Sequence, residues 1–408
     1  MAGQVNSCCS AAARRPLQRP PNGARSTTNL LAPALNIGFV STPTGWGGGE
    51  NLLAQLVLAL RGRGVRAVLA TPRGSAMARW AERERVESIE LPGRGRTPAA
   101  LWRLRRGFAS AGCEIALLND PHAITYGGLA LTGAGVPRVG VRHTVFPVRS
   151  GWKHNRLLER VVAVSAAARE VCLAGGVDAA NLRVIHGGVE PRAVDHAQAV
   201  AVRKRFANAA TDAEERQLVA VGSLLPVKGF DTLIHAVAKA RDNGQAWRLW
   251  IAGEGPQRDE LQSLANERGV AQQVELLGFV DPVSPYLAAA DAFVSASHSE
   301  GLSLVLVEAM LAGAPIAATP VGGAREVLGM RPTDTTSPHA ALFTPGDGEG
   351  ARRAIEQALT KTEAKPQRLD ATRTWANKRF SIDRMAAEYL ELFEEMLASP
   401  DRSVEHAA

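Results

Sequence analysis

The sequence predicts an α/β protein with two Rossmann-like domains that face each other across a cleft. The chain has 408 residues, which is enough for two domains of ordinary size. Short apolar runs alternate with stretches of helical periodicity, which is typical of parallel strands covered by helices on both faces. The alternation occurs twice, and a polar stretch at residues 187–216, with one short helix near Val200–Phe206, separates the two series.

The elements of the first series are predicted from apolar runs and from leucines at helical spacing. The predicted strands are Asn36–Val40, Val65–Thr71, Ile115–Leu118, Arg138–Val141, Val161–Ser165 and Arg183–His186. The predicted helices are Glu50–Arg61, Ile124–Leu131 and Ala166–Leu173.

The second series repeats the pattern and ends in two further helices. The predicted strands are Gln217–Gly222, Arg248–Ala252, Val274–Leu277, Ala292–Ala296 and Pro315–Thr319. The predicted helices are Phe230–Ala240, Pro256–Glu267, Val283–Ala290, Ser303–Ala312, Gly323–Val327, Gly350–Thr360 and Ile382–Leu397.

These elements divide the chain into four parts. Residues 1–34 contain no acidic residue and are rich in Ala, Arg, Pro and Ser, so we expect a disordered basic tail, with a transit peptide as the alternative. Residues 35–195 and 196–375 are expected to form the two Rossmann-like domains. Residues 376–408 are expected to form a helix that packs back on the N-terminal domain.

Composition favours a cytoplasmic globular protein. Hydrophobic residues make up 46% of the chain, and the four cysteines have neither zinc nor redox spacing. No apolar run approaches the roughly 20 residues of a membrane span. Residues 1–190 contain 24 Lys and Arg against 11 Asp and Glu, a net charge of +13, whereas the remainder has 23 against 29.

The basic half favours an acidic surface or substrate, such as the anionic inner face of the cytoplasmic membrane or a phosphorylated glycan. An ordinary solvated surface is the alternative. No aromatic-interleaved basic motif accompanies the charge, so we expect no nucleic-acid partner.

The most informative segment is residues 297–315, which follow a predicted strand. Ser303 is placed to cap a helix with an apolar run at Leu304–Leu311, and Gly313 is suited to end it. The amides at the start of this helix are expected to accommodate a diphosphate. They belong to Gly301, Leu302 and Ser303.

Two acids accompany this helix. Glu300 stands just before it, and Glu308 lies on its second turn after four aliphatic residues. A carboxylate in apolar surroundings is costly unless it accepts hydrogen bonds. The hydroxyls of a ribose would supply them, and bonds to nearby backbone are the alternative.

The spacing Glu300–Glu308, within Glu-Gly-Leu-Ser-Leu and Val-Glu-Ala-Met, resembles that of family 4 retaining glycosyltransferases, including bacterial members that build envelope glycans. The resemblance covers roughly residues 36–360. It implies the glycosyltransferase B fold and transfer of a sugar from a nucleoside-diphosphate sugar. It also implies that Glu300 contacts the transferred sugar and that Glu308 holds the donor ribose.

Two further segments carry the donor side of the resemblance. Lys228, in Lys-Gly-Phe-Asp, is implied to bind the diphosphate, although a solvated loop lysine is the alternative. Ser223 stands where the family usually has Arg, so donor binding is weaker or another cation, such as Arg325, replaces it. Gly253, Glu254 and Gly255 resemble the loop beside the nucleotide base.

Acceptor-side motifs lie in the N-terminal domain. Gly48 and Gly49 open a helix and allow close approach of a phosphate or sugar, and Gly49 replaces the family's Ala. Asn119 aligns with a histidine of several members, and His122 follows three residues later, so either side chain is a candidate. His143 resembles the acceptor-side histidine of envelope-glycan enzymes. Glu300, Lys228, Asn119 and His143 form the expected catalytic set.

No Asp-x-Asp pair follows a strand, so we expect neither a metal nor a cofactor apart from the nucleotide-sugar co-substrate. The expected acceptor is a glycan or a lipid-linked sugar, in cell-envelope polysaccharide or lipopolysaccharide biosynthesis. A nucleotide-sugar epimerase of the same architecture and a non-catalytic sugar-nucleotide binding protein are the alternatives.

Overall fold

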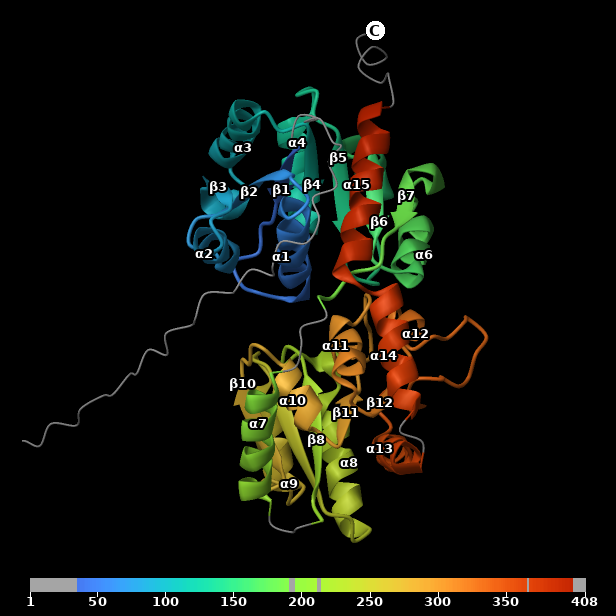
Figure 1. Cartoon of the computed structure of the whole chain (residues 1–408). Helices are drawn as coiled ribbons and strands as arrows, with labels where there is room; N and C mark the ends of the chain where they lie inside the picture. The colour runs from blue at the N-terminus through green and yellow to red at the C-terminus, as the bar shows by residue number, and fades with distance from the viewer. Residues whose placement is uncertain (1–34, 191–194, 211–213, 365–366, 399–408) are drawn as a thin grey trace, which may run out of the picture. The chain divides into compact units, whose positions relative to one another are not determined.

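The structure is a computed structural model that describes residues 35–190, 195–210, 214–364 and 367–398 (Figure 1). The expected basic tail at residues 1–34, together with its transit-peptide alternative, lies outside the described residues.

The first sheet contains seven parallel strands in the order β3-β2-β1-β4-β5-β6-β7. The strands are β1 (Asn36–Val40), β2 (Arg66–Pro72), β3 (Glu87–Leu91), β4 (Ile115–Leu118), β5 (Arg138–Arg142), β6 (Arg160–Ala163) and β7 (Leu182–Val184). The helices between them are α1 (Gly48–Arg61), α2 (Ala76–Arg83), α3 (Pro98–Ala111), α4 (Gly128–Leu131), α5 (Gly151–Leu157) and α6 (Ala166–Ala174).

The second sheet contains six parallel strands in the order β10-β9-β8-β11-β12-β13. The strands are β8 (Arg216–Val221), β9 (Trp247–Ala252), β10 (Val274–Gly278), β11 (Ala292–Ser295), β12 (Ile316–Ala318) and β13 (Ala341–Leu342). The helices are α7 (His196–Ala209), α8 (Phe230–Asp242), α9 (Arg258–Glu267), α10 (Ser284–Ala289), α11 (Leu304–Ala312), α12 (Ala324–Val327), α13 (Gly348–Ala364), α14 (Gln367–Arg379) and α15 (Ile382–Ala398).

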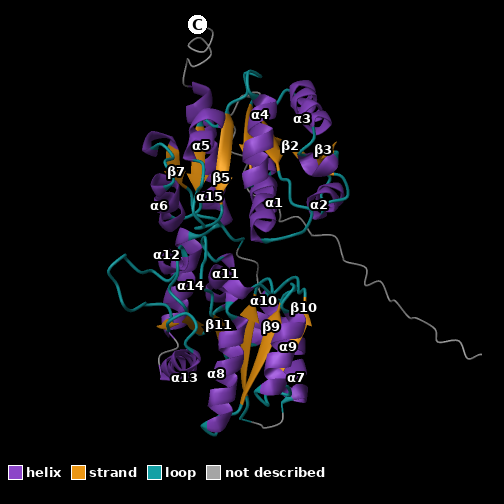
Figure 2. Cartoon of the chain, turned by 180° about the vertical axis from the view of Figure 1, so that it is seen from behind, coloured by secondary structure: helices purple, strands orange, loops and turns teal. Residues whose placement is uncertain are grey.

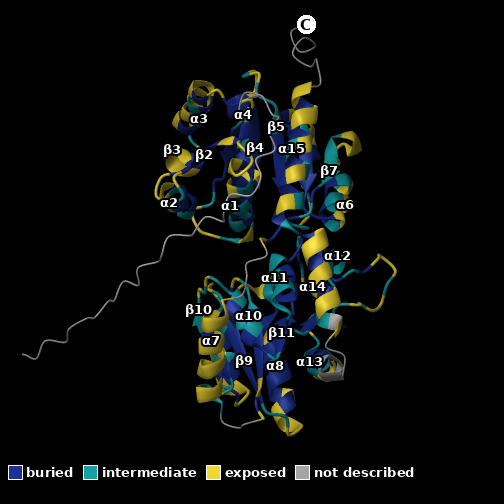
Figure 3. Cartoon of the chain, viewed as in Figure 1, coloured by how far each residue is buried: buried dark blue, intermediate teal, exposed yellow. Residues whose placement is uncertain are grey.

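The α/β class with two parallel sheets is therefore confirmed. Helices flank the strands of both sheets (Figure 2). The central strands β1, β4 and β11 are apolar and buried along almost their whole length, and β8 is buried at residues 217–220, as expected for strands covered on both faces (Figure 3). The predicted helix at 124–131 is interrupted, because residues Ala123–Gly127 form a π-helical turn before α4.

Strand ends bring distant loops together. Val40 of β1 pairs with Leu118 of β4, and Leu118 pairs with Gly140 of β5, so the loops after these strands leave the same edge of the first sheet. In the second sheet, Val221 of β8 pairs with Ala252 of β9 in the same way. Parallel α/β sheets bind their ligands at this carboxyl edge.

The core of the second sheet extends onto α7. Phe206 of α7 stacks on Trp250 of β9 with ring centroids 4.6 Å apart. The buried indole N–H of Trp250 donates to Oε1 of Gln217 at 2.8 Å, so the aromatic ring is buried without leaving its polar atom unsatisfied. Such a stacked pair contributes about 0.5–1.5 kcal/mol beyond its buried area.

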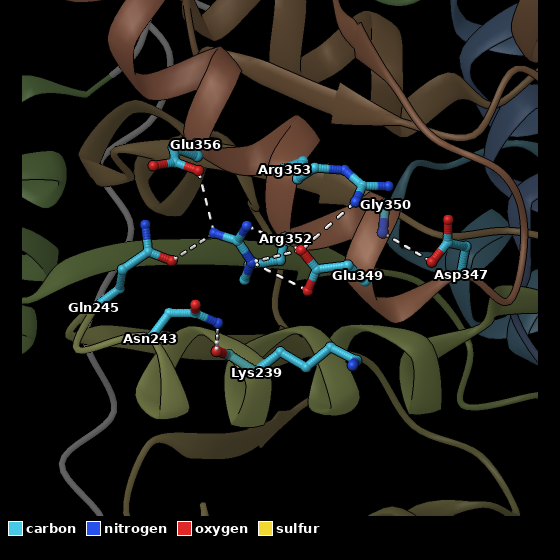
Figure 4. A network of polar contacts seen from close by, with 9 residues as sticks. All are labelled: Lys239, Asn243, Gln245, Asp347, Glu349, Gly350, Arg352, Arg353 and Glu356. Atoms are coloured by element: carbon cyan, nitrogen blue, oxygen red, sulfur yellow. Dashed lines mark hydrogen bonds and ion pairs between the residues drawn. The ribbon is translucent and has the colours of Figure 1, made fainter.

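Helix α13 is held against the end of α8 by a polar network (Figure 4). The guanidinium of Arg352 donates to Glu349 at 2.9 Å, to Glu356 at 3.1 Å and to Gln245, just after α8, at 3.0 Å. Because the Arg352 side chain is only 13% exposed, this network is shielded better than an ordinary surface pair.

The last helix, α15, packs against α1 of the first series. Arg183 of β7 donates to Glu391 at 2.6 Å and to Glu395 at 2.8 Å, and Arg63 donates to Asp383 at 2.5 Å. The C-terminal residues of the described chain therefore cover elements of the first sheet.

Candidate active site

An ion pair with a buried carboxylate lies just after the end of β11. Nζ of Lys228 lies 2.7 Å from Oε1 of Glu300, and the same oxygen accepts a hydrogen bond from Oγ of Ser297 at 2.7 Å. Glu300 is only 9% exposed. Lys228, Ser297, Glu300, Gly301 and Ser303 are called the second-sheet cluster below. The role of Ser297 was not predicted from the sequence.

The position of Lys228 depends on the glycine that follows it. Gly229 has φ +63°, and a Cβ added there would lie 2.2 Å from the carbonyl oxygen of Ala296. The amide of His298 also donates to the carbonyl of Val227 at 2.8 Å. The lysine loop is therefore pressed against the end of β11, which brings the ammonium to Glu300.

The start of α11 differs from the expected cap. Ser303 has φ +72°, its side chain makes no capping bond, and its buried Oγ has no hydrogen-bond partner among the described residues. The expectation that Ser303 caps the helix through its side chain is wrong, because the left-handed backbone turns that side chain away. A strained residue with an unsatisfied polar atom is typical of a site that a ligand completes.

The backbone around Glu300 is held in place. The carbonyl of Glu300 accepts from the amide of Gly323 at 3.0 Å. A Cβ on Gly301 would lie 1.8 Å from the carbonyl oxygen of His143, so the loop after β5 reaches the residue that follows Glu300. Leu302 is buried and Glu308, on α11, is half-buried.

The remaining donor-side residues form two contacting loops. The amide of Leu224 donates to the carbonyl of Glu254 at 2.8 Å, which joins the loop of Ser223 to the loop of Gly253–Gly255. Ser223 is exposed, so no neighbour fills the place of the larger Arg that the family usually has.

Arg325 is engaged elsewhere. Its Nη2 donates to the carbonyls of Arg331 at 2.9 Å, Pro332 at 3.0 Å and Asp334 at 2.9 Å. These bonds give the guanidinium a structural role in the loop after α12. The expectation that Arg325 replaces the missing cation is therefore not supported.

A second polar cluster lies at the carboxyl edge of the first sheet. Nε2 of His143 lies 2.9 Å from Oδ1 of Asn119, and Nδ2 of Asn119 donates to the carbonyl of Gly49 at 3.3 Å. Since the Asn119 oxygen accepts, the hydrogen of His143 is on Nε2 and its Nδ1 carries the lone pair. We call Gly49, Asn119, Asp120, Arg142 and His143 the first-sheet cluster.

Burial lowers the pKa of His143 to about 4, because desolvation disfavours the imidazolium, and the charge of Asp120 only partly offsets this effect. His143 is therefore neutral at pH 7. Its Nδ1 is suited to accept one hydrogen bond from a sugar hydroxyl, and the ring does not act as a cation.

Asp120, for which the sequence gave no expectation, organises this cluster. Its carboxylate accepts from the amide and hydroxyl of Thr42, both at 2.7 Å, and from the amides of His122 and Ala123. The Asp-Pro-His-Ala order after a strand is a helix-start signal that could have indicated it. Asn119 is buried beside His143, whereas the His122 side chain is exposed.

Gly48 is the first residue of α1, and Gly49 lies against the ring of His143. Glu50 accepts from the amide of Gly47 at 3.0 Å, and burial raises the pKa of Glu50. A cavity of about 440 Å³ adjoins these residues and is lined from segments 49–50, 119–125 and 141–154. Its volume suits a small ligand.

Over the described ranges, no three His, Cys, Asp or Glu side chains gather as metal ligands would. Within the same residues, no helix is long and apolar enough to cross a membrane.

Two parallel α/β sheets with polar clusters at their carboxyl edges define a glycosyltransferase B type protein, and comparisons with known proteins agree. Residues 46–193 match the family described as Glycosyltransferase Family 4, and residues 215–361 match Glycosyl transferases group 1. The chain belongs to the group 1 / family 4 glycosyltransferases.

Individual relatives are distant. The chain is 31% identical over 182 residues to the lipopolysaccharide core biosynthesis glycosyltransferase LpsE of Rhizobium meliloti, which covers 45% of this chain and 51% of that protein. It thus spans about half the length of that relative. It is 28% identical over 303 residues to the GDP-mannose-dependent alpha-(1-6)-phosphatidylinositol monomannoside mannosyltransferase of Mycobacterium tuberculosis, which covers 71% of this chain and 72% of that enzyme.

The structure resembles HepE of Anabaena, solved in complex with UDP and glucose, with a TM-score of 0.75 and 21% identity. The likeness covers 88% of this chain and 99% of that one, and at this identity it concerns the fold.

Proposed function

We propose that this protein transfers a sugar from a nucleoside-diphosphate sugar to a glycan or lipid-linked acceptor, with retention at the anomeric carbon. The Lys228–Glu300 pair beside the amides of Gly301–Ser303 carries the proposal. A cation, a helix start and a buried acid at the end of a parallel strand are the groups that a sugar diphosphate requires. The name of LpsE supports a role in envelope polysaccharide or lipopolysaccharide biosynthesis.

The donor is assigned to the domain at residues 196–375. As the bond between the anomeric carbon and the diphosphate oxygen breaks, negative charge grows on that oxygen, and the Lys228 ammonium stabilises it. Glu300 then orients the sugar ring, and Glu308 accepts from the ribose hydroxyls. Gly253–Gly255 border the nucleotide base.

The acceptor is assigned to the domain at residues 35–195. Its hydroxyl is oriented by neutral His143 and Asn119, close to Gly48 and Gly49. The hydroxyl oxygen forms the new bond to the anomeric carbon. Its proton passes to an oxygen of the departing diphosphate, so the step needs no protein base.

A non-catalytic sugar-nucleotide binding protein is the second candidate, because Ser223 is exposed where the family usually has an arginine. Release of free nucleoside diphosphate from a nucleotide sugar on addition of an acceptor supports transfer. Binding without any turnover would favour this second candidate.

A thermal-shift panel with UDP, GDP, ADP, CMP and their sugars tests the donor assignment. A ligand at about 100 times its Kd stabilises the folded state by roughly 2.7 kcal/mol. We expect one nucleotide to stabilise the wild type and Glu308→Ala to lose that shift. Glu394→Ala, which removes an exposed acid of α15, is the matched control and is expected to keep it. A wild type that no nucleotide stabilises would contradict the proposal.

Peripheral contact with an anionic membrane through the basic N-terminal half is part of the proposal. Binding to anionic vesicles is expected to weaken at high salt, because exposed charges are screened. Salt-independent binding, or none, would remove this part alone.

A further inference from the structure

The cavity at the edge of the first sheet has an unusual distribution of charge. Three permanent cations line it, namely Arg142 at the end of β5, Arg149 in the following loop and Lys153 on α5. The side chains of Arg149 and Lys153 have no hydrogen-bond or ion-pair partner in the described part of the chain. Lys153 is half-buried, so its charge is only partly hydrated.

Arg142 is fixed in place rather than free. Its Nε donates to the carbonyl of Thr144 at 3.0 Å and its Nη2 donates to the carbonyl of Phe146. These bonds shape the loop that carries the cavity wall. They neutralise no charge, because both acceptors are backbone carbonyls.

The acids of the cavity do not balance these cations. Asp120 accepts hydrogen bonds only from the neutral amides and hydroxyl of Thr42, His122 and Ala123, so it keeps a single negative charge against the three cations. Glu50 is bonded to the amide of Gly47, and its pKa is raised by burial, which disfavours its charged form. The cavity therefore keeps an excess of positive charge.

His154 responds to the same cations. Burial lowers the pKa of His154 most, and the charges of Arg142 and Lys153 lower it further, whereas a hydrogen bond from Nδ1 of His154 to the carbonyl of Ser150 raises it. Both cations thus act on one region of the cavity wall.

We infer that the acceptor carries an anionic group, a carboxylate or a phosphate, which Lys153 and Arg149 bind in this cavity. The inference rests on the proposed function. His143 lines the same cavity, and its carbonyl meets the backbone of Gly301, next to Glu300. An acceptor held by its anion is thereby placed with a hydroxyl near the reacting sugar, and the cations gain the partner that the protein does not supply.

The anion has two possible sources, a soluble acidic sugar and a lipid phosphate. Phe146, 56% exposed, and Trp152, 63% exposed, lie beside Pro147 and Lys153 in the sequence. Exposed aromatic rings of this kind stack on ligands or enter a membrane interface. Lys153 and Arg149 would bind the anion of either source in the same way. Separate experiments, one with soluble sugars and one with lipid vesicles, distinguish the two sources.

Calorimetric titration of the full chain measures the soluble arm. The probes are methyl glucuronide, glucose 6-phosphate and neutral methyl glucoside. We expect the anionic probes to bind at least about tenfold more tightly than the neutral one, and Lys153→Gln or Arg149→Gln to remove most of this difference. Lys153→Arg is expected to restore binding. Arg156→Gln, on the same helix but outside the cavity lining, is the matched control.

Co-sedimentation with phosphatidylglycerol vesicles, against phosphatidylcholine vesicles, measures the lipid arm. Binding lost in Lys153→Gln and in Trp152→Ala, but kept in Arg156→Gln, assigns the anion to a lipid. Equal binding of charged and neutral probes in both arms overturns the inference. An effect of Arg156→Gln as large as that of Lys153→Gln also overturns it, because the attraction would then be general.

Nucleotide-induced thermal shifts on the same samples separate failure of the anionic-acceptor inference from failure of the proposed transferase function. A retained nucleotide shift without anion selectivity rejects only the anionic acceptor. Anion selectivity without any nucleotide shift supports the cavity and counts against the transferase.

Discussion

The second-sheet cluster and the first-sheet cluster occupy the same edge of similar sheets, yet they are built differently. In the former, Lys228 and Glu300 neutralise each other, and the backbone around Glu300 is held by Gly229, Gly301 and Gly323. In the latter, the acid Asp120 is bound to backbone amides and to Thr42, and the adjoining cavity is lined by Arg149 and Lys153, which have no side-chain partner among the described residues. A preformed cluster suits a ligand with a constant part, such as a diphosphate, whereas an open charged cavity suits a ligand that differs between enzymes.

The largest effect is expected from a substitution that breaks the ion pair of the second-sheet cluster. Lys228→Met is expected to lower kcat about 10²–10³-fold, because the leaving diphosphate loses its cationic partner. Steady-state kinetics with the nucleotide sugar found in the thermal-shift panel measures it. Lys239→Met removes an exposed lysine of α8 and is expected to leave kcat unchanged. Equal loss in both variants would argue that general charge, and not the pair, matters.

A pair of glycine substitutions compares the tightness of the two clusters. Gly301→Ala is expected to destabilise the fold by about 2–3 kcal/mol, since its Cβ would lie 1.8 Å from the backbone oxygen of His143. Gly49→Ala places its Cβ 3.5 Å from the His143 ring and adds a better helix former, so we expect a change within about 0.5 kcal/mol. Denaturant unfolding measures both. Equal effects would show that the contact with His143 is adjustable.

Placing an arginine at the exposed position of Ser223, in the donor-side loop, tests whether the second-sheet cluster is complete without a second cation. Ser223→Arg is expected to lower the Kd of the nucleoside diphosphate about tenfold, because a second cation joins Lys228 and no neighbour obstructs it. Ser223→Gln is the uncharged control. Unchanged affinity in calorimetry would mean that Lys228 and the amides of Gly301–Ser303 already satisfy the diphosphate.

A smaller effect is expected from the histidine of the first-sheet cluster. Because the pKa of His143 falls from 6.5 to about 4 on folding, the unfolded chain binds more protons between these values. The free energy of unfolding therefore decreases as pH falls from about 6.5 to about 4. His143→Gln is expected to flatten this part of the curve of Tm against pH. An unaltered curve would assign the acid sensitivity to other groups.

The difference between the clusters also explains what the sequence could predict. Buried strands such as β1 and β11 are short apolar runs, and Lys228, Glu300 and Glu308 belong to motifs whose order along the chain is distinctive. Strand β3 was not predicted, because Glu-Ser-Ile-Glu-Leu mixes charges with apolar residues at the sheet edge. Helix α3 was not predicted either, since its arginines obscure the apolar face.

Contacts between distant segments could not be predicted from the sequence for another reason. The pairing of Lys228 with Glu300 and the approach of His143 to Gly301 arise only when separate loops meet at a sheet edge. The cavity cations Arg149 and Lys153 belong to none of the motifs that resemble family 4 glycosyltransferases. Their significance depends on having no partner in the folded chain that the structure describes.

Retention at the anomeric carbon is the central chemical claim, and proton NMR of the first-formed sugar tests it most directly. The enzyme is incubated with the α-linked nucleotide sugar that stabilises it and with water as the acceptor, and the anomeric signal of the released free sugar is recorded before it mutarotates. The account predicts that the α signal appears first, with Lys228→Met giving the same anomer more slowly. A β product appearing first would contradict the proposed mechanism.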